Sequence, residues 1–488
     1  MRFDMFYELA VPQFTGLSER EVYEHSLDEI ALADGAGFDG VWLVEHHFFR
    51  EYSHCPAPEV IFGAISQRTE RMRIGHGVVL LPFNHPVRVA ERIAALDILS
   101  GGRMDVGVGR GVSPLEYEVF GGKMVESRAR VDEGLEILRR AWGGEPLSFD
   151  GQFWSFPEID VVPKPLQKPH PPLWTAAVSP ETFPMAAEQG LGVLAGPFKP
   201  LFMISEDRER FVDRCHELGR DPAELGFGMT VGVVVLDDHE RAREVAATNI
   251  RWFYEQLLRL TAPVLEKGGE AYRYYREELG TLRSLTGGTP SLEALEAAGM
   301  VVAGDPEHAI EQLRGLADHG IDHVLCALQA GGVPHADVMR SIELFGEQVI
   351  PALRGLRTGV EAPADGRGPK HADMRIVLRE SKNVTPELLF RALPLSFRRD
   401  RADGLRALYQ IDLAGDGGGT WWVEVAGARC VVSREQPESE PDVRIRSDAE
   451  TWVELAKGNR SQLGSVLRRR LRVKGDRRKA AQFARLFQ

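Results

Sequence analysis

The 488-residue sequence is poor in cysteine and has no long apolar run. Its four cysteines, Cys55, Cys215, Cys326 and Cys430, are far apart, and none belongs to a Cys-x-x-Cys pair. This spacing argues against a disulfide framework and a zinc site, and it favours free thiols in a reducing, cytoplasmic compartment. No apolar stretch approaches the roughly 20 residues of a membrane helix, and the first residues do not form a signal peptide. We therefore expect a soluble protein without an integral membrane segment.

Other absences exclude whole classes of protein. Fifty glycines and 29 prolines are too few for a collagen-like or low-complexity chain. Hydrophobic residues at 43% and charged residues at 27% are typical of globular proteins. The length predicts two to four domains, or fewer if one of them is a large barrel.

The net charge of −13 conceals two parts of opposite sign. Residues 370–488 contain 24 basic and 16 acidic residues, a net charge of +8, so the preceding part carries −21. Between the two parts, residues 357–369 are rich in Gly, Pro and Ala, the composition of a linker. We therefore predict one domain over 1–356, a linker over 357–369 and a second domain over 370–488. The basic run at 468–479 lacks the interleaved aromatic residues of a nucleic-acid site, so we expect a solvated face and no nucleic-acid partner.

Short β-rich runs alternate with amphipathic helical stretches in residues 1–356. We expect strands over 3–9, 40–45, 73–81, 104–108, 173–177, 191–195, 226–236 and 323–328. Ser18 followed by Glu21 predicts a capping box at the start of a helix over 18–37. Eight strands in this order favour an α/β fold, a TIM (β/α)₈ barrel with insertions. No Gly-x-Gly-x-x-Gly follows the first strand, which argues against a Rossmann domain.

Polar residues follow two of these strands, where a TIM barrel places its chemistry. Glu-His-His at 45–47 follows the second strand, and Gly-Arg-Gly at 109–111 follows the fourth. An imidazole can move protons near neutral pH, and an Arg between glycines can bind phosphate. From these residues alone, a hydrogen-bonded loop histidine and a salt-bridged rim arginine are equally open. No further ligand cluster accompanies the two histidines, so we expect no metal site.

Residues 37–48 resemble the bacterial luciferase-like family of flavin-dependent monooxygenases. Collinear similarity continues at 84–88, 100–103, 109–111, 119–121, 127–129, 163–169 and 342–345. The resemblance implies a barrel that binds reduced flavin mononucleotide (FMN), which a separate flavin reductase can supply. It further implies transfer of one oxygen atom from dioxygen to a hydrophobic small molecule, and a homodimer.

The resemblance also implies roles for individual residues. His46 is then the catalytic base or proton relay, and Arg110 contacts the flavin phosphate with two hydroxyl groups after the fifth strand. The residues that the resemblance places at the cofactor are Gly77, Val78, Gly109, Arg110, Ser179 and Thr182. It also implies a non-proline cis peptide bond between Gly77 and Val78. On local sequence alone, Ser179 can equally be a plain helix N-cap.

Six aromatic residues are candidates for the wall of an apolar substrate pocket, with ordinary packing as the alternative. They are Trp42, Phe48, Phe49, Tyr52, Phe83 and Tyr117. Residues 257–298 form an insertion where the family has a lid that keeps water from the reaction.

The second domain has its own strand pattern. Residues 408–413 and 420–425 alternate around a glycine turn at 415–419, which predicts a hairpin. A strand over 442–447, a helix over 448–457, a strand over 471–476 and a terminal helix complete a smaller α+β domain. Residues 418–421 and 472–476 resemble the sterol-carrier-protein type lipid-binding domain, which implies an apolar tunnel. The alternative is that Trp421, Trp422 and Phe397 simply fill a core.

The leading hypothesis is an FMN-dependent monooxygenase with a C-terminal domain that binds lipid or substrate. Gly109 and Val178 depart from the light-emitting members of the family and favour a reaction without light. Two alternatives are a deazaflavin (F420)-dependent oxidoreductase and a non-enzymatic lipid carrier.

Overall fold

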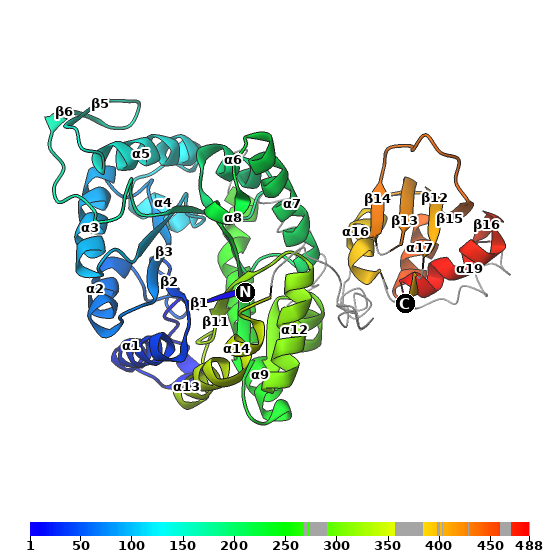
Figure 1. Ribbon diagram of the computed structural model, residues 1–488, viewed down its shortest axis with the longest axis horizontal. Helices are drawn as coiled ribbons and strands as arrows, with labels where there is room; N and C mark the ends of the chain where they lie inside the picture. The colour runs from blue at the N-terminus through cyan, green and yellow to red at the C-terminus, as the bar shows by residue number, and fades with distance from the viewer. Residues whose placement is uncertain are drawn as a thin grey trace. The chain divides into compact units, whose positions relative to one another are not determined.

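The computed structural model describes residues 1–267, 272, 290–356, 384–397, 401–402, 404–427, 429–458 and 470–487. These residues form two compact units, one built on a parallel barrel and the other on a five-stranded sheet (Figure 1). The predicted linker over 357–369 lies outside the described residues, so the exact domain limits stay a prediction.

Eight parallel strands close into the barrel of the first unit. Each strand pairs with the next, and the last pairs with the first, which closes the ring. In ring order they are β1 (Arg2–Tyr7), β2 (Gly40–Leu43), β3 (Arg73–Leu80), β4 (Met104–Gly109), β7 (Leu173–Ala177), β8 (Gly192–Ala195), β9 (Phe227–Val235) and β11 (His323–Ala327). They are the eight strands expected from the sequence, and the prediction of a TIM barrel is confirmed.

Helices lie outside this ring of strands (Figure 1). The longer ones are α1 (Glu19–Ala36), α2 (Pro58–Arg68), α3 (Pro86–Leu99), α5 (Ser127–Ala141), α6 (Thr182–Gln189), α7 (Leu201–Glu217), α9 (His239–Lys267), α12 (Pro306–Asp318) and α13 (His335–Leu344). Shorter ones are α4 (Pro114–Val119), α8 (Pro222–Leu225) and α14 (Ile350–Leu353), while α11 (Leu292–Ala297) is grouped with the second unit. The predicted capping box is present at α1: the Ser18 hydroxyl accepts from the Glu21 N–H, and the Glu21 carboxylate accepts from the Ser18 N–H.

Three strands of the first unit were not expected from the sequence. Strand β10 (Val301–Gly304) pairs with the end of β9 outside the ring, and β5 (Leu147–Asp150) with β6 (Ser155–Ile159) makes an antiparallel hairpin. The predicted insertion over 257–298 begins inside α9 and ends with α11, while 268–271 and 273–289 lie outside the described residues.

The prediction of a cis peptide bond between Gly77 and Val78 was wrong. Among the described residues, cis bonds occur at Val162–Pro163 and Lys168–Pro169, so the Gly77–Val78 bond is trans. The backbone irregularity at this point is instead a shift of register between β3 and β4, located between His76 and Val79. A bulge of this kind re-aims side chains without a change of peptide geometry.

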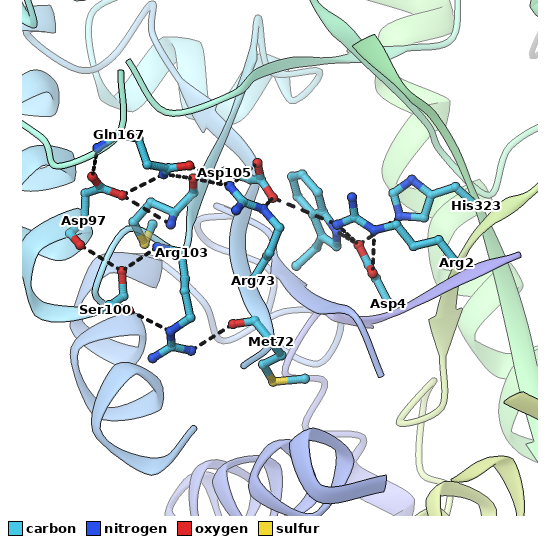
Figure 2. A network of polar contacts seen from close by, with 12 residues as sticks. Arg2, Asp4, Met72, Arg73, Asp97, Ser100, Arg103, Asp105, Gln167 and His323 are labelled. Carbon is cyan, nitrogen blue, oxygen red and sulfur yellow. Dashed lines mark hydrogen bonds and ion pairs between the residues drawn. The ribbon is translucent and has the colours of Figure 1, made fainter. Parts of the chain in front are cut away.

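A buried ionic network fills the barrel near the N-terminal ends of its strands (Figure 2). Asp4 of β1 is fully buried; it lies 2.8 Å from His323 Nε2 and accepts a hydrogen bond from Arg2 at 2.7 Å. Arg73 of β3 donates to Asp105 of β4 at 2.6 Å. A buried carboxylate is costly unless it is paired, so these partners are what makes Asp4 tolerable inside the barrel.

Trp42 belongs to this same layer. Its indole N–H donates to Asp4 at 2.7 Å, and its ring meets Trp174 edge to face at 5.3 Å. A Cβ atom at Gly75 would lie 2.3 Å from the Trp42 ring, so the ring fits only because position 75 is glycine. Trp42 is therefore a core residue of the barrel.

The second unit is a sheet in the order β14-β13-β12-β15-β16. Its strands are β12 (Arg406–Ala414), β13 (Gly419–Ala426), β14 (Arg429–Ser433), β15 (Val443–Asp448) and β16 (Arg472–Gly475), and its helices include α16 (Pro386–Ala392), α17 (Ala449–Ala456) and α19 (Arg477–Leu486). The predicted hairpin is β12 with β13; β14 was not predicted. Trp421 and Phe397 lie in the core, and the Phe390 ring stacks on Trp421 at 4.4 Å.

Candidate active site

One pocket opens where the barrel strands end at their carboxyl side. It encloses about 1220 Å³ free of protein atoms, including the part open to solvent. The predicted residues that line it are His46, Gly77, Val78, Gly109, Arg110, Ser179 and Thr182. Residues that follow β1, β2, β4 and β7 thus share one cavity, at the face of a TIM barrel where active sites occur.

Glycine at position 109 shapes the floor of this pocket. A Cβ atom there would lie 2.3 Å from Val78 Cγ2, so β3 and β4 approach this closely only because the residue is glycine. The predicted catalytic and phosphate-binding residues therefore converge around a tightly packed floor.

Of the six aromatic candidates, Tyr52 lines the pocket, whereas the other five are not among its lining residues. Trp42 lies in the ionic layer, and Phe48 is half exposed, with a left-handed backbone conformation (φ 69°). Phe83 packs edge to face on Tyr117 at 4.7 Å, and the Tyr117 hydroxyl donates to the Arg110 carbonyl oxygen. Apolar side chains that line the pocket include Phe6, Val44, Leu80, Leu194, Phe198, Leu257 and Leu260.

His46 lies between two buried carboxylates. Its Nε2 atom is 3.8 Å from Glu8 Oε2, and its Nδ1 atom is 3.7 Å from Glu116 Oε1. Burial alone would lower the pKa of His46, but the carboxylates of Glu116, Glu8 and Glu45 outweigh burial and raise it. Burial raises the pKa of Glu8. The acidic neighbours therefore favour the protonated form of His46.

Glu45, beside His46 in the sequence, has a structural role. Its carboxylate accepts from the Leu80 N–H at 2.9 Å and from Asn84 Nδ2 at 2.9 Å. Burial would raise the pKa of Glu45, but His47 and these two donors outweigh burial and lower it. Glu45 therefore ties the end of β2 to the end of β3.

The other end of the pocket is rich in hydrogen-bond donors. Arg110 and Arg128 both line it, and the Arg110 guanidinium lies 4.6 Å from the centre of the Tyr272 ring. Burial lowers the pKa of Arg128, and the positive charge of Arg110 lowers it further. Two guanidinium groups that repel each other are stabilised by an anion, although Glu181 Oε1 at 3.6 Å from Arg128 offsets part of that charge.

Ser179 and Thr182 are buried at the start of α6. The Thr182 N–H donates to the Ser179 carbonyl oxygen at 2.9 Å, and the N-cap of α6 is Glu181, so Ser179 is not a plain N-cap. Hydroxyl groups at a helix N-terminus beside two arginines make a donor set that fits a phosphate group.

Four residues of the site were missed by sequence reasoning: Glu8, Glu116, Arg128 and Tyr272. Glu8 had a signal, because it continues the inward alternation of Asp4 and Phe6 along β1. Arg128 lies within a segment of family similarity. Glu116 is distant in sequence from His46, and no sequence signal pointed to it.

The described residues also bear on metals and membranes. In the ranges that the structure covers, no group of three or more His, Cys, Asp or Glu side chains could hold a metal ion. No helix in those ranges is both long and apolar enough to span a membrane.

Comparison with known proteins identifies the family. Residues 1–323 match the model of the luciferase-like monooxygenases. The chain belongs to this family. Residues 389–488 match the SCP-2 sterol transfer family, so this luciferase-like monooxygenase carries an SCP-2 domain.

Named relatives agree with this assignment. The oxygenase component of the flavin-dependent trigonelline monooxygenase from Acinetobacter baylyi is 30% identical over 52% of this chain and 70% of its own length. The alkanal monooxygenase alpha chain of Aliivibrio fischeri is 29% identical over 65% of this chain and 90% of its own.

Solved structures share the barrel. The monooxygenase RslO1 from Streptomyces bottropensis superposes with a TM-score of 0.60 at 27% identity, over 72% of this chain and 99% of its own. An F420-dependent secondary alcohol dehydrogenase shows the same fold with a TM-score of 0.55 at 19% identity, over 72% and 99%.

Proposed function

We propose that this luciferase-like monooxygenase uses reduced FMN and dioxygen to oxygenate a hydrophobic small molecule. The observation that carries the proposal is that the donor set of Arg110, Arg128, Ser179 and Thr182 and the titratable His46 line one pocket. A flavin nucleotide needs both features, an anion site for its phosphate and a proton-transfer group near its ring.

The residues then divide the work. Arg110, Arg128 and the two hydroxyl groups bind the phosphate and orient the cofactor. Reduced flavin, when bound, supplies the electrons that activate dioxygen. His46 moves a proton at Nε2, the ring nitrogen that faces Glu8. The apolar side chains of the wall exclude water and accommodate an apolar substrate.

The choice of flavin is supported by the name of the relative from Acinetobacter baylyi, a flavin-dependent oxygenase component. An oxygenase component implies a partner that reduces the flavin, so we propose that a separate flavin reductase supplies this chain as well. F420 is the alternative cofactor.

For the second unit, we propose that it binds a lipid or the oxygenase's own apolar substrate. The match to the SCP-2 family supports this role. Trp421 and Phe397 lie in the core of the unit, so a ligand would have to be accommodated beside these rings.

The decisive experiment combines cofactor and oxygen. The full chain is mixed anaerobically with reduced FMN or reduced F420, and ¹⁸O₂ is then admitted with candidate aldehydes, ketones and terpenoids. We expect binding of FMN and one ¹⁸O atom in the product. Hydride transfer from F420 without oxygen uptake would instead identify a dehydrogenase, and lipid binding without any flavin binding would identify a carrier.

A further inference from the structure

Glu8 is a buried carboxylate beside His46. It follows β1, its side chain is 7% exposed, and it lines the pocket together with His46. One oxygen, Oε1, accepts a hydrogen bond from the Tyr52 hydroxyl at 2.9 Å. The other, Oε2, has no hydrogen-bond partner within the described part of the chain, and it lies 3.8 Å from His46 Nε2.

An unsatisfied buried carboxylate oxygen is expensive. Leaving a buried acceptor unpaired loses its hydration without replacing it, and the loss is larger when the group is charged. A movement of less than about 1 Å would bring His46 Nε2 within ordinary hydrogen-bond distance of this oxygen. The unpaired oxygen thus faces His46 Nε2, a titratable nitrogen that can share a proton with it.

The backbone around Glu8 is held in a strained conformation. Leu9 has φ 55°, a left-handed conformation that is rare for a non-glycine residue. Ser53 Oγ donates to the Glu8 carbonyl oxygen at 2.7 Å, and the His54 N–H donates to the Leu9 carbonyl oxygen at 3.0 Å. Strain that neighbouring hydrogen bonds maintain is typical of functional sites. Here the strained turn directly follows the residue that faces His46.

We propose that Glu8 is a positioning residue for His46, holding Nε2 at the pocket wall and sharing its proton. The step is a proton transfer alone: the N–H bond of Nε2 lengthens or breaks as the O–H bond at Oε2 forms, and no electrons are exchanged. This role deepens the proposed function and rests on it for its catalytic meaning.

Four groups face His46 from neighbouring elements and would contribute to its titration. Glu8 comes from the end of β1, Glu116 from α4, Glu45 from the end of β2, and Tyr52 from the loop that follows. Glu8 lies on the Nε2 side of the ring and Glu116 on the Nδ1 side. A change at Glu8 therefore alters one side of the ring and leaves the other carboxylate in place.

The chain contains a matched control that does not line the pocket. Glu29 is also a buried carboxylate that accepts from a tyrosine hydroxyl, that of Tyr7 at 2.8 Å, and lies 2.8 Å from a histidine nitrogen, Nδ1 of His335. Glu29→Gln removes the same kind of group with similar burial but does not touch His46. Glu8→Gln and Glu29→Gln are therefore equivalent in size and charge.

The test measures the titration of His46 directly in the full chain without flavin. Diethylpyrocarbonate reacts with neutral imidazole, so peptide mass spectrometry across a pH series gives the midpoint for His46. An opposite charge within about 4–6 Å raises a histidine pKa by about 1–3 units. In Glu8→Gln the midpoint is therefore expected to fall by about one pH unit or more. It should move little in Glu8→Asp, which keeps the charge, and not at all in Glu29→Gln.

The outcomes separate this inference from the proposed function. An unchanged His46 midpoint in a folded Glu8→Gln chain overturns the role of Glu8, even if the wild type oxygenates substrates with FMN. The same is true if Glu29→Gln moves the midpoint as far as Glu8→Gln. If the midpoint falls as expected but no flavin binds, the pair exists and the proposed function fails. Should Glu8→Gln be unfolded, Tyr52→Phe, which removes the donor to Oε1, must alter the His46 midpoint.

Discussion

Replacing Arg110 tests the proposed phosphate site most directly. The side chain lines the pocket, lies over Tyr272 at 4.6 Å and is close enough to Arg128 to lower the pKa of that second arginine. A hydrogen bond to a charged group contributes about 1.5–3 kcal/mol, which corresponds to about a tenfold to 150-fold change in affinity. Arg110→Ala should therefore weaken binding of reduced FMN by about that factor.

The assay compares two flavins in anaerobic fluorescence titrations. Riboflavin lacks the phosphate, so its affinity should change by less than about threefold in Arg110→Ala, the size of an indirect effect. Arg130→Ala is a control on the same helix as Arg128, because Arg130 binds Glu126 at 3.1 Å and packs over Phe153 away from the pocket. Equal losses for FMN and riboflavin would refute the assignment, as would a loss in Arg130→Ala that matches that of Arg110→Ala.

Three further outcomes follow from the structure. The His46→Ala variant should bind reduced FMN almost as tightly as the wild type. Its kcat should be lower by about 10²-fold or more, because proton transfer contributes about that factor to the rate. Stopped-flow turnover measurements and parallel binding titrations check both values. Burial would raise the pKa of Asp4, but His323 and Arg2 outweigh burial and lower it, so its pairing stabilises the barrel above about pH 4 and is lost as the pH falls further. Asp4→Asn should lower the free energy of unfolding of the barrel by about 3–5 kcal/mol near pH 7. Its urea-unfolding midpoint should also fall less steeply at acid pH than that of the wild type, and an unaltered acid slope would contradict this interpretation. Trp421→Ala should lower the free energy of unfolding of the second unit by about 3–5 kcal/mol, because the ring is 1% exposed and stacks on Phe390. Amide hydrogen exchange should then be faster in that unit, while the barrel stays protected.

Much of the fold was predictable because its signals are local. The β-rich runs and the capping box at Ser18 each depend on a few neighbouring residues, and all eight barrel strands were found from them. Strand β10 was missed because its four residues pair only with the end of β9, a partner that local sequence does not reveal. Pairing between segments about 70 residues apart has no sequence signal of its own.

The site was predicted in part, for the same physical reason. The residues carried over from the family, His46, Arg110 and Ser179, line one pocket, because a family motif records an arrangement in space. Glu116 approaches His46 from a separate helix, and only the fold brings the two together. The carboxylates that raise the pKa of His46 are therefore the part of the site that was least predictable from the sequence.

Two of the aromatic predictions, Phe48 and Trp42, were wrong for reasons of backbone geometry. Phe48 follows His46 by two residues, so the alternation of an extended chain would place both side chains on one side. Its left-handed conformation breaks that alternation, and the ring lies 5.4 Å from Phe120 and half exposed. One unusual φ angle therefore directs the Phe48 side chain out of the pocket. Trp42 obeys the alternation, but it lies deeper in the barrel than the pocket, in the layer of the ionic network. The direction and the depth of a side chain both depend on its neighbours in the fold. Gly75, for example, has no side chain and so makes room for the Trp42 ring, which cannot be inferred from Trp42 itself.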